Sequence, residues 1–160
     1  MALGGFDRAL WLVILGLLAA IAGVAVYKVQ PLLNPKPVLS APLDPGCDLR
    51  LGPCRARFPG GGELTFEIRP STLPVLVPLT LKVAVDGLEA SAAEVDFAGV
   101  DMNMGFNRVA LRPVGGGRFE GEGMLPTCVR DRMSWEAKVL VQSRAGLAAA
   151  PFRFETRRNP

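Results

Sequence analysis

The sequence predicts an all-β fold: an immunoglobulin-like antiparallel β-sandwich of roughly seven or eight strands, preceded by one N-terminal transmembrane helix. Three observations predict it: an apolar stretch near the N-terminus, a proline-rich segment after it, and a long region in which apolar and polar residues alternate. The alternating region contains no convincing amphipathic helix, which favours an all-β domain. An open β-barrel is the alternative that the same alternation allows.

The apolar stretch covers residues 10–30 and carries a single charged side chain, Lys28. At 1.5 Å per residue, a helix of about 20 residues spans about 30 Å, the thickness of the hydrocarbon core of a bilayer. A cleaved signal peptide is the competing interpretation, because Ala20–Ile21–Ala22 resembles a cleavage site. The apolar run continues beyond that site, which favours an uncleaved anchor. Residues 1–9 are then a short cytoplasmic leader.

The proline-rich segment covers residues 31–46 and separates the helix from the alternating region. It contains five prolines, at positions 31, 35, 37, 42 and 45. Repeated prolines remove backbone N–H donors and disfavour both helix and sheet, so we expect an extended, semi-rigid linker. The exported β-sandwich domain is then expected over residues 47–157.

The alternating runs are short and half apolar, and Gly, Pro, Asp or Asn residues bound them. They are Glu63–Ile68, Leu79–Val85, Glu94–Phe97, Val109–Arg112, Arg118–Gly121, Glu136–Val141 and Phe152–Glu155. Two triple-glycine runs, Gly60–Gly62 and Gly115–Gly117, lack the Lys-Ser/Thr of a phosphate-binding loop and lead into predicted strands. We therefore expect them to form hairpin turns.

Charge and composition exclude several classes of function. The net charge of +3 comes without a run of basic residues, so we expect no nucleic-acid partner. The chain has no histidine, which removes imidazole-based catalytic triads, histidine zinc sites and histidine-ligated haem. We therefore predict that the protein is not an enzyme.

Three cysteines allow one disulfide and leave one thiol over. Cys47 and Cys54 bracket a Gly52–Pro53 turn that could bring them together. Pairing Cys54 with Cys128 would close a longer loop and restrict the unfolded chain more. We favour Cys47–Cys54, which leaves Cys128 as the free thiol.

Sulfur side chains make up the candidate metal site. In an extended segment, Met102 and Met104 point to the same side. With Cys128, Met133 and Met124 they form a set of soft ligands that suits Cu(I), and we expect no other cofactor. The alternative is that these residues fill gaps in the core, the commoner role of methionine.

Three short motifs carry a resemblance to a family: Met102–Gly105, Gly117–Gly121 and Met133–Val141. Together with the N-terminal helix, they are similar to those of the small membrane-anchored FixH- and YtkA-like proteins. The resemblance implies an immunoglobulin-like domain on the outer face of the inner membrane, associated with copper handling or the assembly of haem–copper oxidases. It also implies that Met102 and Met104 are exposed loop methionines and that Trp135 is the core tryptophan. The lack of histidine and the added cysteines depart from the family pattern.

Two functions are therefore expected from the sequence. The first is a membrane-anchored periplasmic accessory protein that binds or passes Cu(I), or assists assembly of a copper-containing oxidase. The second is a structural or accessory subunit of an inner-membrane complex that holds no metal. Both place one helix in the inner membrane and the C-terminal domain in the periplasm, where a haem–copper oxidase or its assembly factors would be the partner.

Overall fold

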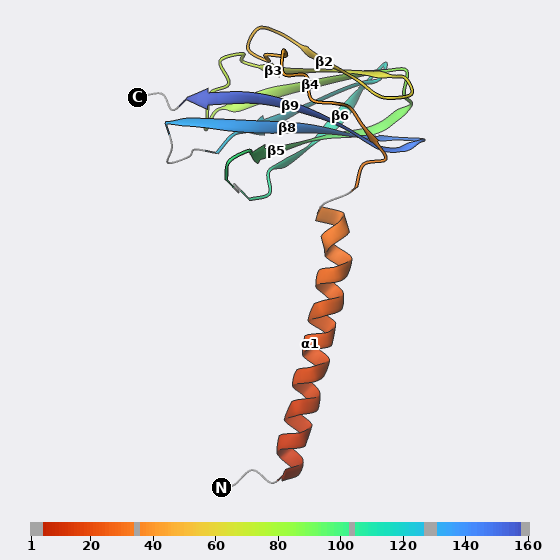
Figure 1. Cartoon of the computed structure of the whole chain (residues 1–160), viewed down its shortest axis with the longest axis vertical. Coiled ribbons are helices and arrows are strands. Elements are labelled where there is room, and N and C mark those ends of the chain that lie inside the picture. Colours follow the sequence, from red (N-terminus) through yellow and green to blue (C-terminus); the bar gives the residue numbers. More distant parts are fainter. Residues whose placement is uncertain (1–4, 34–35, 103–104, 127–130, 158–160) are drawn as a thin grey trace. The chain divides into compact units, whose positions relative to one another are not determined.

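The structure is a computed structural model, and it describes residues 5–33, 36–102, 105–126 and 131–157. The chain divides into two compact units, Met1–Lys36 and Pro37–Pro160. The first contains the helix and the second contains the strands (Figure 1). Each unit is described separately below.

Helix α1 (Gly5–Leu33) is the N-terminal element that the apolar stretch predicts. Its segment Ala9–Gln30 has a mean hydropathy of 2.7 and is long and apolar enough to cross a membrane. The helix extends beyond residues 10–30 at both ends, because each added residue gains a hydrogen bond once the helix has nucleated. It ends at Leu33, so Pro31 and the two leucines after it, which the sequence assigned to the linker, belong to the helix.

The second unit is all-β, and the described residues form nine strands. They are β1 (Leu39–Ser40), β2 (Cys54–Arg57), β3 (Glu63–Arg69), β4 (Pro78–Asp86), β5 (Ala90–Gly99), β6 (Arg108–Gly115), β7 (Arg118–Met124), β8 (Arg132–Ser143) and β9 (Gly146–Arg157). Each of the seven alternating runs lies in one of strands β3 to β9, which confirms the all-β prediction. The two further strands, β1 and β2, have only two and four residues, too few to show an alternating pattern.

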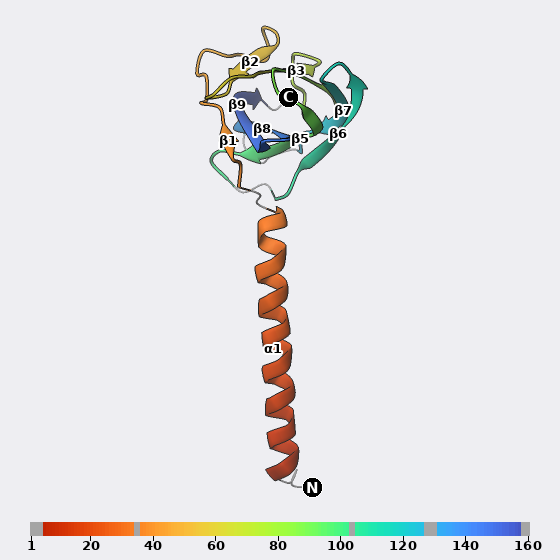
Figure 2. The same ribbon diagram turned by 90° about the vertical axis from the view of Figure 1, so that its right-hand side faces the viewer.

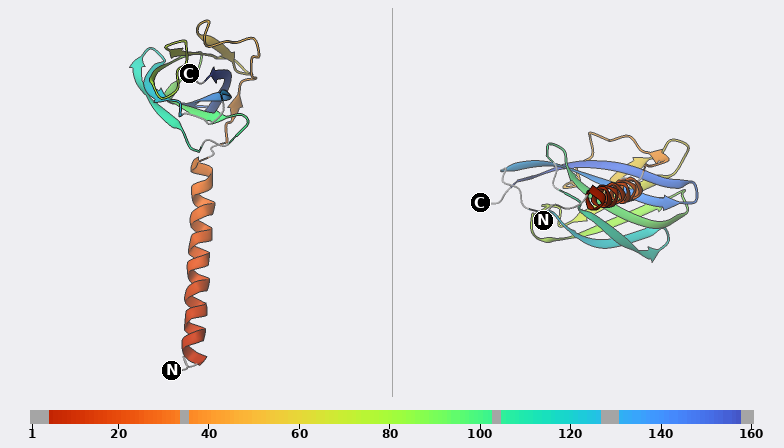
Figure 3. Two further views of the ribbon diagram at one scale, coloured as in Figure 1. Left: turned by 90° about the vertical axis from the view of Figure 1, so that its left-hand side faces the viewer. Right: turned by 90° about the horizontal axis from the view of Figure 1, so that it is seen from below.

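The nine strands form one curled sheet, in the order β1-β9-β8-β5-β6-β7-β4-β3-β2. The curl brings two layers face to face around a common core, as the view along the strands shows (Figures 2 and 3). Strand β6 joins the layers, because residues up to Leu111 pair with β5 and residues from Arg112 pair with β7. The domain therefore has the two packed layers of a β-sandwich. Its strands also follow one continuous hydrogen-bonded order, as they do in an open barrel.

Close contact between β6 and β7 depends on a glycine. A Cβ atom at Gly121 would lie 2.7 Å from Cδ2 of Leu111 and 3.3 Å from the carbonyl oxygen of Ala110. The turn that joins these strands also needs glycine, since Gly116 and Gly117 have φ of 61° and 69°. The predicted hairpin at Gly115–Gly117 is thus present between β6 and β7.

The boundary of the β-domain differs from the expected one, because part of the proline-rich segment belongs to the sheet. Val38 N–H donates to the Leu147 carbonyl (2.7 Å) and Ala41 N–H donates to the Ala149 carbonyl (2.9 Å). Strand β1 lies between these bonds and pairs in parallel with β9. The four residues between Pro37 and Pro42 contain no proline, so they retain the N–H groups that a ladder needs. The linker predicted over residues 31–46 is therefore too long.

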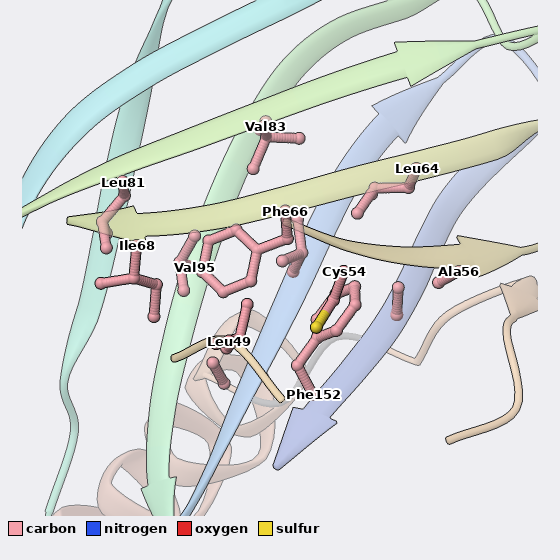
Figure 4. Packing of buried hydrophobic residues seen from close by; sticks show 14 of the residues in the cluster. Leu49, Cys54, Ala56, Leu64, Phe66, Ile68, Leu81, Val83, Val95 and Phe152 are labelled. Atoms are coloured by element: carbon pink, nitrogen blue, oxygen red, sulfur yellow. The ribbon is translucent and has the colours of Figure 1, made fainter. Parts of the chain in front are cut away.

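The core lies between the two layers and is apolar. Trp135 is fully buried, and its Nε1–H donates to Oγ1 of Thr156 across the β8–β9 pair (2.9 Å). The rings of Phe66 and Phe152 meet with their centroids 5.3 Å apart and join the two layers (Figure 4). The buried polar atom of Trp135 is thus satisfied, as burial of an indole requires.

Candidate functional site at one end of the β-domain

Three connections approach one another at one end of the β-domain, which we call the loop end. Their described residues are 70–77, then 100–102 and 105–107, and finally 125, 126 and 131. Val100 N–H donates to the Ser134 carbonyl (3.0 Å), which ties the loop after β5 to the start of β8. The Asn107 side-chain amide donates to the Met124 carbonyl (3.1 Å), and Leu76 N–H donates to the Leu125 carbonyl (2.9 Å). Segments that are far apart in the sequence therefore lie side by side here.

The described sulfur residues of the predicted metal site have different environments at this end. Met102 is half-buried and packs against the hydrophobic core. Met133 belongs to the core and is 6% exposed, whereas Met124 is 50% exposed. Met104 and Cys128 lie outside the described residues.

Met124 and Met133 do not converge on one side of the sheet. Met124 follows the buried Gly123 at the end of β7 and faces outward, as the alternation of that strand requires. Met133 is the second residue of β8 and faces the core, in step with the buried Trp135. Met124 and Met133 therefore face opposite sides of the sheet, and Met133 packs in the core. The ligand set as a whole stays a prediction.

The cysteine pairing is resolved by the structure. Cys47 and Cys54 form a disulfide, with their Cα atoms 5.7 Å apart. The structure thus has the short loop rather than the long Cys54–Cys128 loop. Cys128 is not part of this bond.

An exposed apolar cluster at the loop end was not expected from the sequence. Its members are large hydrophobic residues of these connections and of the end of β7, with exposed fractions between 42% and 64%. They are Leu76, Val77, Val100, Phe106 and Met124. We call these five residues the apolar cluster. The signal in the sequence is weak: four of the five are apolar residues in loops, and the fifth, Met124, ends a strand. It becomes informative only when the fold shows that these loops lie at the same end of the domain.

Phe106, the aromatic residue of the apolar cluster, packs against the guanidinium of Arg108. The guanidinium carbon of Arg108 lies 5.0 Å from the centre of the Phe106 ring, a cation–π contact. The side chain of Arg108 is only 11% exposed, and its Nη2 group lies 3.0 Å from a carboxylate oxygen of Asp96 on the neighbouring strand. Asp96 thereby fixes the guanidinium, and the guanidinium fixes a ring that remains 64% exposed.

These observations define a β-domain with an exposed apolar end, joined in sequence to one helix that is long and apolar enough to span a membrane. No family model matches the sequence, and no curated protein matches it. The resemblance to the FixH- and YtkA-like proteins stays a prediction. The expectation that the protein is not an enzyme also stays a prediction.

Proposed function

We propose that the protein is a single-pass accessory subunit of an inner-membrane complex, and that its periplasmic β-domain binds a partner protein through the apolar cluster. The observation that carries the proposal is the gathering of five exposed hydrophobic side chains at the loop end. Large apolar patches with a polar rim are typical of interaction sites on soluble domains. No metal takes part in this function.

The location of the domain is supported by two features. Helix α1 contains a segment that is long and apolar enough to anchor the chain. The Cys47–Cys54 disulfide favours an oxidising compartment, because cytosolic reductants keep most thiols reduced. The periplasmic side of an inner membrane meets both conditions.

The geometry of the apolar cluster suits a partner that binds a pre-ordered surface. Phe106 is held by Arg108 and Asp96, so little side-chain freedom is lost when a partner covers the ring. Aromatic residues are enriched among the few interface residues that contribute most of the binding free energy. Phe106 is therefore the side chain we expect to contribute most.

A protease experiment tests the proposed topology. We expect protease added to the periplasmic face of spheroplasts to digest the β-domain and to leave a fragment that contains α1 in the membrane fraction. Protease added to inside-out vesicles should leave the domain intact. A domain digested only in inside-out vesicles would contradict the proposed orientation.

A matched pair of valines tests the partner surface. Val100 in the apolar cluster and Val114 on β6 are 42% and 44% exposed, and Val114 lies roughly 20 Å along β6 from the loop end. We expect Val100→Ser to release the chain from its complex in native gel electrophoresis of solubilised membranes. Val114→Ser should leave the complex intact. Release by both variants, or by neither, would contradict the proposal.

A second candidate function is Cu(I) binding at the same end, in support of copper-oxidase assembly. The observation that favours it is that both Met102 and Met124 lie at the loop end. Thioethers are suitable ligands for Cu(I) and poor ligands for Zn²⁺. The residues expected to hold the ion are Met102 and Met104, with Cys128 completing the site.

Titration of the reduced protein with Cu(I) against a competing chelator distinguishes the two candidates. Met102→Leu combined with Met104→Leu conserves volume and should weaken Cu(I) binding at least tenfold if copper is bound there. Met133→Leu is the matched control, since its thioether lies in the core. Equal affinities for the wild type and the double variant would leave the partner-binding function as the one supported.

A further inference from the structure

The segment between β1 and β2 has an unusual position, because it connects the two edges of the curled sheet. Strand β1 is the first strand in the sheet order and β2 is the last. Residues 42–53, which we call the strap, run from one edge to the other (Figure 2). The strap therefore covers the side on which the sheet remains open.

The strap makes no hydrogen bond to the sheet within the described part of the chain. Its hydrogen bonds are local turns: Gly46 N–H to the Asp44 carboxylate, Arg50 N–H to the Asp48 carboxylate, and backbone bonds from Cys47 to Asp44 and from Leu51 to Asp48. The last ladder bond before it is the one from Ala41 to Ala149. Backbone pairing thus holds the ends of the strap and not its middle.

Two side chains fasten the middle of the strap. Leu49 is 1% exposed and belongs to the buried cluster that contains Phe66 and Phe152 (Figure 4). Cys47 is half-buried and is bonded to Cys54, the first residue of β2. The buried Leu49 and the disulfide of Cys47, which itself packs against the core, therefore hold the middle of the strap.

We infer that the Cys47–Cys54 disulfide is a redox latch: its reduction releases the strap, withdraws Leu49 from the core and opens the sandwich between its two edges. The rest of the sheet does not depend on the strap for its ladder bonds, since β2 to β9 pair with one another. Opening is therefore local and leaves the remaining strands folded.

The reaction requires a protein dithiol of the thioredoxin type as reductant. One thiolate of the dithiol attacks Sγ of Cys47, which is half-buried and more accessible than the 5%-exposed Cys54. The bond between the two sulfurs breaks, and Cys54 leaves as a thiolate that takes up a proton. The second thiol of the dithiol then attacks the sulfur that the reductant contributed to the mixed disulfide. Cys47 leaves as a thiolate and takes up a proton. Two electrons and two protons pass to the protein, and the dithiol becomes a disulfide.

Hydrogen–deuterium exchange of the full chain in nanodiscs tests the latch, with and without a dithiol reductant. We expect reduction to raise the exchange rates of residues 42–53 at least tenfold, while the central β8 residues Val139–Val141 remain protected. Trypsin should cleave after the exposed Arg50 faster in the reduced protein. Unchanged exchange in the strap, or equal loss of protection in β8, would overturn the inference.

A variant separates the latch from other effects of the reductant. Cys47→Ser combined with Cys54→Ser should show the rapid strap exchange without any reductant, and adding dithiol should change it no further. A dithiol effect of equal size in this variant would show that the effect arises elsewhere and would overturn the latch. If the double variant does not fold, the exchange of the reduced wild type tests the latch alone. The comparison is then between residues 42–53 and Val139–Val141 of β8.

Discussion

The strap and the loop end are both irregular and both contain large apolar side chains, but the burial of these side chains differs. In the strap, Leu49 is buried and only Leu51 is left largely exposed. At the loop end, Phe106 and its neighbours remain exposed although charged groups fix the ring in place. The difference indicates that the strap completes the fold, whereas the loop end is available for a partner.

A substitution of Trp135 should give the largest effect, because this side chain supports the core directly behind the loop end. It is fully buried and pairs with Gly99, the last residue before Val100. We expect Trp135→Ala to lower the free energy of unfolding by about 3–5 kcal/mol, since it opens a large cavity and leaves Thr156 without its indole partner. Urea titration of the full chain measures this change.

The neighbour Ser134 is the control for that measurement. Its side chain is half-buried, and only its backbone carbonyl bonds to the loop. Ser134→Ala should change the free energy of unfolding by no more than about 0.5 kcal/mol. Equal stabilities of wild type and Trp135→Ala would show that the core behind the loop end is not rigidly packed.

The two leucines of the strap provide a matched pair with the next largest effect. Leu49 is 1% exposed and Leu51 is 90% exposed, although they are two residues apart. We expect Leu49→Ala to lower the free energy of unfolding by about 2–4 kcal/mol, and Leu51→Ala by less than about 0.5 kcal/mol. Both are measured by urea titration under oxidising conditions, so that the disulfide stays closed. Similar values for the two variants would contradict the view that the strap completes the core.

The alternating pattern predicts the strands well because it is a local property. Residues such as Leu64, Phe66 and Ile68 face the core whatever their partner strands are. Strands β1 and β2 escaped prediction because two and four residues give too short a pattern. Prolines on both sides of β1 concealed it further.

The candidate site is less predictable, since it depends on which loops the sheet brings together. Met124 and Met133 are close in sequence, and both have a thioether that could bind a soft metal ion. Met124 lies at the end of β7, however, and Met133 lies near the start of β8. Whether they face the same side depends on where β7 ends and β8 begins, and a shift of one residue reverses the answer. The Cys47–Cys54 disulfide is easier to predict from the sequence, because only seven positions separate the two cysteines.

Substitutions in the apolar cluster should lower stability less than those of Trp135 or Leu49, and this sharpens the contrast between the loop end and the buried part of the strap. Phe106 is 64% exposed, so Phe106→Ser removes little buried area and should change the free energy of unfolding by less than about 1 kcal/mol. The loss consists mainly of the contact with Arg108, which remains bonded to Asp96. The measurement is a urea titration of Phe106→Ser beside Leu49→Ala.

The same Phe106→Ser variant should lose its partner, because an aromatic side chain that dominates an interface commonly contributes roughly 2 kcal/mol or more of binding free energy. Phe106→Tyr keeps the ring over Arg108 and should retain the partner, which separates the role of the ring from that of general hydrophobicity. A Phe106→Ser variant that unfolds as readily as Leu49→Ala would place Phe106 among the residues that complete the fold. A stable Phe106→Ser variant that still enters its complex would remove the apolar cluster as the binding surface.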